Sequence, residues 1–149
     1  MTKPEFLSSA TAAARRCSAW SGLPPGITVA QAALESAWGQ SQLARDAHNY
    51  FGIKAHGAHL FITLPTTEVV RGQPMRTAAR FARYASMDEC FADRDRLLCT
   101  SRLYAGACAC AHHPEAFARA LAVHWATDPQ YADKLLAVWR ENQLDSLIC

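Results

Sequence analysis

The stretch that most constrains this chain is residues 28–39, TVAQAALESAWG, which predicts a short helix carrying one carboxylate near its end. Thr28 followed three residues later by Gln31 has the form of a capping box at a helix start. Gly39 suits the left-handed residue that commonly follows a helix end. Small apolar residues recur between these points at helical spacing, so one face of the helix should pack inward. Glu35 therefore falls in the last turn of an inward-packing helix.

A carboxyl group at this position is expected to hold its proton more tightly than an ordinary glutamate. The C-terminal end of the helix dipole opposes a negative charge, and the neighbouring Trp38 can exclude water from Glu35. Both effects raise a carboxyl pKa, which is the property that a general acid needs. Glutamates on helices are more often solvated surface residues, so the interpretation depends on the rest of the chain.

Length and composition indicate one globular domain covering residues 1–149, because half of the chain is hydrophobic. The net charge of +2 is too small to suggest a nucleic acid partner and is compatible with an anionic polymer. No apolar run approaches the roughly 20 residues that cross a bilayer, so we expect no membrane insertion. The N-terminal segment has no apolar core after Lys3, and we expect no Sec signal peptide.

The pattern along the chain predicts an α+β fold that is mostly α. Residues 57–84 are the exception, with short alternating runs that predict a small antiparallel hairpin or three-stranded lobe turning at residues 71–74. Proline and glycine within this lobe suggest that it is short and edge-like. The predicted helices cover 4–19, 28–39 and 40–48 and begin again at Ser86, Pro114 and Pro129, with a turn at 21–27 and an irregular connection at 103–113.

Residues 31–55, QAALESAWGQSQLARDAHNYFGIKA, resemble the signature of the family 73 glycoside hydrolases, bacterial N-acetylglucosaminidases that cut peptidoglycan glycan strands. The resemblance continues in the family's order through TTEVVRG, RFARYASMDECFADRDRLL, RLYAGA and ATDPQYADKLLAV, and covers roughly residues 20–140. It implies a lysozyme-like helical lobe and a β-hairpin lobe that form a cleft for the glycan. The implied reaction is cleavage of the N-acetylglucosaminyl-β-1,4-N-acetylmuramic acid linkage.

The resemblance also implies roles for individual residues. Glu35 matches the general acid, and Glu68 matches a second acidic residue on the hairpin. Tyr131 matches a tyrosine that faces the substrate near the scissile bond, although a core aromatic is an equal alternative. Asp93 matches an acidic helix position that we include among the substrate-binding candidates, and its alternative is a solvated or capping side chain. HGAHLFITLP stands where many members have Trp-x-Gly, which leaves the reach of Glu68 open.

Four further residues are candidates for contacts with the glycan: Trp38, Asn49, Tyr50 and Phe51. Aromatic rings stack on sugars, but Trp38 and Phe51 are more often core residues at such positions.

The reaction needs no cofactor, and we expect no metal. The run Cys-Ala-Cys-Ala-His-His at 108–113 lacks the usual spacing of a structural zinc site. A disulfide from Cys108 or Cys110, with Cys99 as a candidate partner, is favoured over a metal site, while six reduced thiols are an equal alternative to disulfides.

Two mechanisms remain open at this stage. Glu68 can activate a water as a base, which predicts inversion at the anomeric carbon. Alternatively, the N-acetyl group of the substrate attacks while Tyr131 supports it.

Other functions on the same scaffold also remain open: a muramidase or lytic transglycosylase, a phage endolysin, or a non-catalytic glycan-binding module. The favoured expectation is a secreted antibacterial toxin, similar to type VI-secreted glucosaminidase effectors, that acts in the periplasm of a target cell. The expected partners are then peptidoglycan glycan strands and a cognate immunity protein that occludes the cleft.

Overall fold

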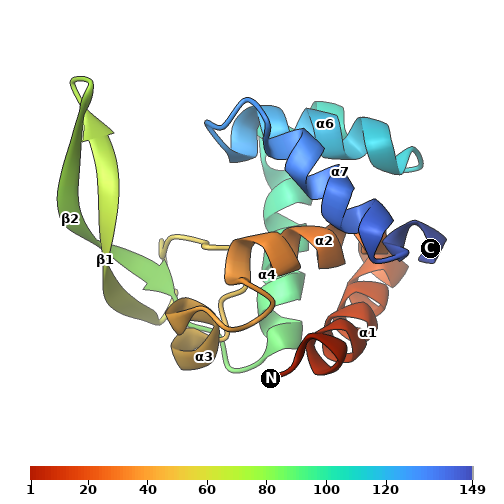
Figure 1. Ribbon diagram of the computed structural model, residues 1–149, viewed down its shortest axis with the longest axis horizontal. Helices are drawn as coiled ribbons and strands as arrows, with labels where there is room; N and C mark the ends of the chain where they lie inside the picture. Colours follow the sequence, from red (N-terminus) through yellow and green to blue (C-terminus); the bar gives the residue numbers. More distant parts are fainter. Residues whose placement is uncertain (149) are drawn as a thin grey trace.

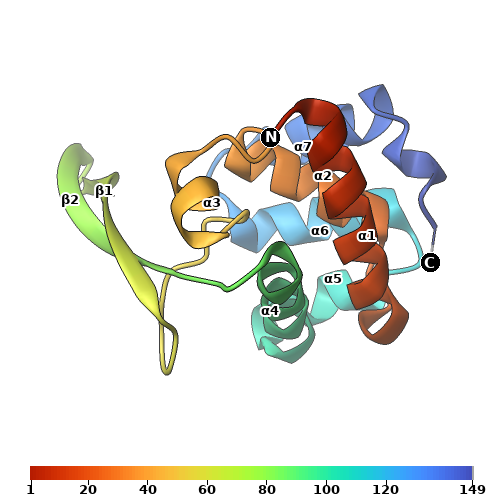
Figure 2. The same cartoon turned by 90° about the horizontal axis from the view of Figure 1, so that it is seen from below.

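The computed structural model describes residues 1–148 and confirms a mostly helical fold with one small β-hairpin (Figure 1). The elements are α1 (Lys3–Ser21), α2 (Pro25–Ser36), α3 (Gln42–Ala47), β1 (Phe61–Val70), β2 (Gln73–Ala82), α4 (Met87–Thr100), η1 (Arg102–Tyr104), α5 (Ala105–Ala109), α6 (Pro114–Trp125), α7 (Tyr131–Glu141) and η2 (Leu144–Ser146). The helices gather in one body, and the hairpin projects from one side of it (Figures 1 and 2). Within the described range, no helix has the length and apolar character needed to cross a bilayer.

Helix α2 lies at the centre of the helical body and is buried along most of its length. Its small side chains allow α1 and α7 to pack directly against it. At Gly26 the approach is so close that a Cβ atom would overlap the carbonyl oxygen of Leu144 and crowd the indole nitrogen of Trp139. Glu35 therefore belongs to a helix that is tightly packed against its neighbours.

The predicted start and end of this helix were each wrong by three residues. The helix begins at Pro25, because proline fits the first turn, where its missing N–H group has no partner to lose. Thr28 and Gln31 consequently lie inside the helix and form no capping box. At the other end the helix stops at Ser36, and residues 37–39 all have positive φ angles, of 50°, 59° and 80°.

The other helices follow the sequence pattern closely. Ser86 caps α4 as predicted, with its hydroxyl accepting the Glu89 N–H at 3.1 Å, and α6 begins at Pro114. The last helix begins at Tyr131 rather than at Pro129, because Asp128 to Gln130 form a preceding turn. The connection at 103–113, predicted to be irregular, contains the short helix α5.

The hairpin lies within residues 57–84, where it was predicted, and its strands are longer than the short runs in the sequence pattern. Strands β1 and β2 pair over ten rows, from Phe61 opposite Ala82 to Val70 opposite Gln73. A two-residue turn at Arg71 and Gly72, both with positive φ, joins them, which is the geometry that matches the twist of paired strands. The small, edge-like lobe is confirmed, and in an edge strand a proline costs no interior ladder bond, so β1 and β2 continue through Pro65 and Pro74. A single bridge between Lys54 and Phe81 adds to the base of the sheet.

The five cysteines at positions 17, 90, 99, 108 and 110 are free thiols in the structure. The predicted disulfide from Cys108 or Cys110 to Cys99 is therefore not formed, and Cys149 lies outside the described residues. The thiols of Cys99 and Cys108 are nevertheless hydrogen-bonded to each other, and Cys108 also donates to the carbonyl oxygen of Leu98 at 3.2 Å. Hydrogen bonding and side-chain packing thus accommodate this pair in its reduced form.

Candidate functional site

Glu35 lies in the last turn of α2, as predicted, and its carboxylate meets side chains from α6 and α7. The hydroxyl of Tyr131, the first residue of α7, donates to Glu35 Oε1 at 2.6 Å. Trp125, the last residue of α6, supplies a second side-chain hydrogen bond. The carboxylate is thus enclosed where α6 ends and α7 begins, about 90 residues further along the chain.

Burial raises the pKa of Glu35 above its ordinary value, and the hydrogen bonds from Tyr131 and Trp125 lower that pKa in part. The predicted rise in the pKa of Glu35 is therefore correct, but Trp38 is not the neighbour that shields its carboxyl group. Trp38 packs edge-on against Phe6, with ring centroids 5.8 Å apart, and lies under the ammonium group of Lys3 at 4.3 Å. Trp38 turns toward α1 because residues 37–39 bend the chain away from the helix axis.

Tyr131 is a protonated donor at neutral pH. Burial raises its pKa most, and the adjacent charge of Glu35 and the hydrogen bond to that group raise the pKa further. The structure therefore brings together two of the three residues predicted to be catalytic, and it gives them a short, direct hydrogen bond.

Glu68 lies apart from this pair, near the tip of the hairpin and opposite Met75. Its carboxylate accepts from the ammonium group of Lys54 at 2.9 Å, and its side chain is 45% exposed. In the described part of the chain, no hydrogen bond or ion pair joins Glu68 to Glu35. The hairpin thus holds this carboxylate in a solvated setting beside the ammonium group of Lys54.

Two buried polar residues that the sequence analysis did not connect with the site lie behind Tyr131. Gln31 on α2 and Arg94 on α4 are both fully buried, and Gln31 contacts the Tyr131 hydroxyl at 3.4 Å. Arg94 donates to Gln31 Oε1 from two nitrogen atoms, at 3.1 and 2.8 Å. The available signal was a polar residue at an inward position of each helix, but helical periodicity alone does not say which polar residues meet.

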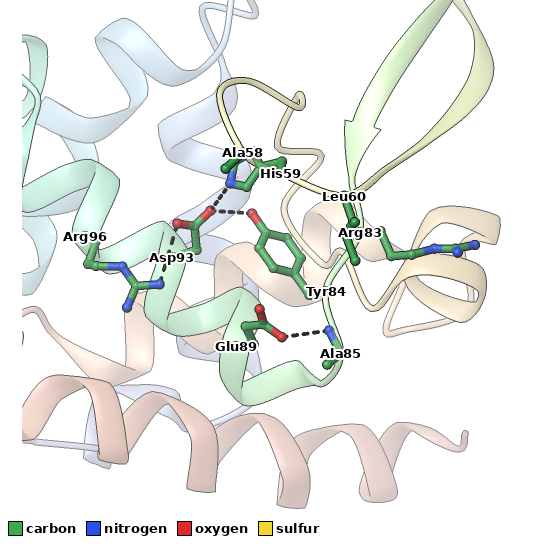
Figure 3. A pocket seen from close by; sticks show the side chains of 9 residues that line it. All are labelled: Ala58, His59, Leu60, Arg83, Tyr84, Ala85, Glu89, Asp93 and Arg96. Atoms are coloured by element: carbon green, nitrogen blue, oxygen red, sulfur yellow. Dashed lines mark hydrogen bonds and ion pairs between the residues drawn. The ribbon is translucent and has the colours of Figure 1, made fainter.

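Asp93 joins both ends of the hairpin to α4 (Figure 3). Tyr84, which follows β2, donates its hydroxyl proton to Asp93 Oδ2 at 2.6 Å. The ring nitrogen Nε2 of His59, which precedes β1, lies 3.0 Å from the same oxygen. Arg96, one turn along α4, approaches the other oxygen at 3.6 Å. These residues line a pocket of about 320 Å³ at the hairpin base, and Glu35 is not among its lining residues.

Three of the predicted substrate contacts are buried instead. Asn49, Tyr50 and Phe51 are 1%, 5% and 2% exposed. The Asn49 amide nitrogen donates to the carbonyl oxygens of Ile53 and Ala82, both at 2.9 Å, so it ties the hairpin base to the preceding loop. Phe51 packs against other aromatic rings in the core. These side chains have no free face for a sugar, and we assign them to packing that positions the hairpin.

Asp93→Asn is expected to loosen the hairpin base, because the single amide oxygen carries no negative charge and accepts more weakly than the carboxylate from Tyr84 and His59. Hydrogen bonds to charged groups are worth roughly 1.5–3 kcal/mol, and the neutral amide should lose part of this. Hydrogen exchange of backbone amides at residues 56–62 and 81–84 should become faster. Asp88→Asn on the same helix is the matched control, since Asp88 makes only an exposed ion pair with Arg16. Equal hydrogen-exchange rates in the two variants would contradict an anchoring role for Asp93.

Comparison with known proteins finds relatives that are named as enzymes. The family model described as glucosaminidase, mannosyl-glycoprotein endo-beta-N-acetylglucosaminidase, matches residues 11–144. Exo-glucosaminidase LytG of Bacillus subtilis is 35% identical over 126 residues, which are 81% of this chain and 45% of LytG. Peptidoglycan hydrolase FlgJ of Salmonella typhimurium is 34% identical over 140 residues, 90% of this chain and 44% of FlgJ. The chain thus spans less than half the length of these curated relatives.

Among solved structures, the catalytic domain of the autolysin Auto from Listeria monocytogenes is similar in fold. It superposes with a TM-score of 0.86 at 31% sequence identity, and the match covers 95% of this chain and 85% of that domain.

Proposed function

Because this chain belongs to the glucosaminidase family, we propose that it is a peptidoglycan hydrolase that cleaves the N-acetylglucosaminyl-β-1,4-N-acetylmuramic acid linkage of glycan strands. The observation that carries the proposal is the enclosed Glu35 carboxyl group, with its raised pKa and its 2.6 Å hydrogen bond from Tyr131. Relatives named as a glucosaminidase and as a peptidoglycan hydrolase support both the linkage and the polymer.

In the proposed reaction, Glu35 donates its proton to the glycosidic oxygen as the bond breaks. A raised pKa keeps this group protonated at a pH where an ordinary glutamate is ionised. Activity should therefore be lost on the alkaline side as the pH rises through the pKa of Glu35. The hydroxyl of Tyr131 steadies the carboxylate that remains after proton transfer, because it already donates to that oxygen.

Two routes complete the reaction. Glu68 is exposed and paired with Lys54, and on the first route it is the base that activates water and gives inversion. The N-acetyl group of the substrate is the alternative nucleophile, and Tyr131 beside Glu35 supports that route. The anomeric configuration of the first product, followed by NMR within seconds of mixing, distinguishes inversion from retention.

The linkage itself is tested on purified sacculi. Products are reduced with borohydride and identified by mass spectrometry, with the Glu35→Gln variant as the blank. We expect N-acetylglucosaminitol at the new reducing end. N-acetylmuramitol would instead indicate a muramidase, and a 1,6-anhydromuramic acid end would indicate a lytic transglycosylase. Binding to sacculi without any released product would support a glycan-binding module.

Peptidoglycan lies outside the cytoplasmic membrane, so the proposed enzyme acts there. A finer proposal is that the enzyme is an antibacterial toxin of the target-cell periplasm, restrained by an immunity protein that covers Glu35. Expression with an added periplasmic signal should then be toxic, and expression without that signal should be harmless. Rescue by the product of an adjacent gene would support the immunity partner, and toxicity that no neighbouring product relieves would remove it.

A further inference from the structure

The hydrogen bonds behind Tyr131 form a chain whose direction is set by Arg94. A guanidinium group carries only donors, so the Gln31 atom that Arg94 contacts at 2.8 and 3.1 Å must be the amide oxygen. The Gln31 amide nitrogen is then left facing the Tyr131 oxygen at 3.4 Å. The side chains of Gln31 and Arg94 are fully buried, so their amide and guanidinium groups are shielded from solvent.

This arrangement fixes the direction in which the Tyr131 hydroxyl donates its proton. Its oxygen accepts from Gln31, and its single proton therefore goes to Glu35 Oε1, 2.6 Å away. A hydroxyl group that accepts a hydrogen bond becomes a better donor, because the bonds polarise one another. The two contacts of Tyr131 thus reinforce each other.

Arg94 is itself held in place from its far side. Its NH1 nitrogen donates to Thr28 Oγ1 at 2.9 Å and to Asp95 Oδ1 at 2.8 Å. The other oxygen of Asp95 accepts from the hydroxyl of Ser21 at 2.7 Å. The chain of contacts therefore runs from α1 and α4, through α2, to the site at the start of α7.

We propose that Arg94 and Gln31 are positioning residues, which fix Tyr131 as a hydrogen-bond donor to Glu35 and thereby set the pH range in which Glu35 holds its proton. This inference rests on the proposed role of Glu35 as general acid.

In the described part of the chain, few other groups shift the pKa of Glu35 or of Tyr131. Hydrogen bonds from Tyr131 on α7 and Trp125 on α6 affect the pKa of Glu35, and the charge of Arg94 on α4 affects the pKa of Tyr131. Glu68 on β1 is not among the groups that shift either pKa. A change at Gln31 should therefore reach Glu35 through Tyr131 alone, and a double-mutant cycle can test that route.

The cycle compares the full chain with Gln31→Met, Tyr131→Phe and the double variant. The pKa of Glu35 is measured from its ¹³C carboxyl signal by NMR, assigned by its loss in Glu35→Gln, and the alkaline limb of hydrolysis is measured in parallel. Loss of the Gln31 donor weakens the Tyr131 bond to the carboxylate, so Gln31→Met should shift the pKa of Glu35 and the alkaline limb to higher pH. In the Tyr131→Phe background, the same change at Gln31 should cause no further shift.

The matched control is Gln42→Met, an exposed position in the first turn of α3, which should leave both measurements at their wild-type values. Circular dichroism melts establish that each variant is folded. Where Gln31→Met does not fold, Arg94→Lys replaces it, since a lysine keeps the buried charge but not both contacts to Gln31. That variant should shift the pKa of Glu35 in the same direction.

An unchanged pKa in folded Gln31→Met, or an equal shift in the presence and absence of the Tyr131 hydroxyl, would overturn the inference. The NMR titration needs no substrate, so it reads the positioning role even if the chain hydrolyses no peptidoglycan. A pKa that shifts without any change in the pH profile would keep the positioning role and remove Glu35 as the general acid.

Discussion

Glu35→Gln is expected to lower the rate of peptidoglycan hydrolysis by roughly 10²–10⁴-fold, the usual contribution of a general acid. The amide has nearly the same shape and its oxygen still accepts from Tyr131, but it has no proton to give. Release of soluble fragments from labelled sacculi measures the loss. Glu141→Gln, an exposed glutamate at the end of α7, is the control and should retain full activity.

The same variant should be at least as stable as the wild type at neutral pH. The pKa of Glu35 is raised in the folded state, so the stability that its protonated form contributes is present at low pH and is lost as the pH rises through that folded pKa. Above that folded pKa, the glutamine removes the cost of a half-buried charge. Thermal melts of both proteins at pH 5 and pH 8 test the direction of this pH dependence of stability. Near-wild-type hydrolysis, or a clear loss of stability at pH 8, would contradict the role given to Glu35.

Arg94→Met is expected to have the largest effect on stability, with a loss of about 3–5 kcal/mol of unfolding free energy. Arg94 is fully buried and its ion-pair partner Asp95 is only 1% exposed, so the methionine would leave a buried carboxylate without its cation. Gln31 and Thr28 would lose their donors as well. Urea unfolding followed by circular dichroism measures the change.

Arg96→Met makes the same chemical change two residues further along α4. The Arg96 side chain is 57% exposed and its contact with Asp93 is 3.6 Å long, so this variant should cost less than about 1 kcal/mol. Similar losses in the two variants would mean that the buried network adds no more to stability than an exposed ion pair does.

Several parts of the site were predictable because they depend on residues close together in the sequence. The inward face of α2 follows from apolar residues three and four positions apart, and Glu35 falls near the end of the helix because the positive-φ residues that stop it, 37–39, come directly after Ser36. The hairpin follows from two extended runs separated by Arg71 and Gly72, whose positive φ angles suit its turn. Asp93 and Tyr131 were found only through the resemblance to a family of known enzymes.

The wrong expectations concern side chains whose surroundings come from distant segments. Phe51 and Trp38 are aromatic residues beside the signature, and the sequence does not say whether such rings face a ligand or the core. The structure buries Phe51 against other rings and packs Trp38 on Phe6 at the start of the chain. Asn49 was predicted to contact sugar, but the carbonyl oxygens of the hairpin base already occupy its amide.

Helix periodicity, caps and turns involve residues a few positions apart, so the amino-acid sequence was enough to predict one carboxyl group at a helix end and a hairpin lobe. The groups that surround that carboxyl group depend instead on how distant helices pack. Tyr131 lies 96 positions from Glu35, and Arg94 lies 63 positions from Gln31. The partners of a buried polar group are chosen by helix packing, because every donor and acceptor that loses water must find another within hydrogen-bond distance.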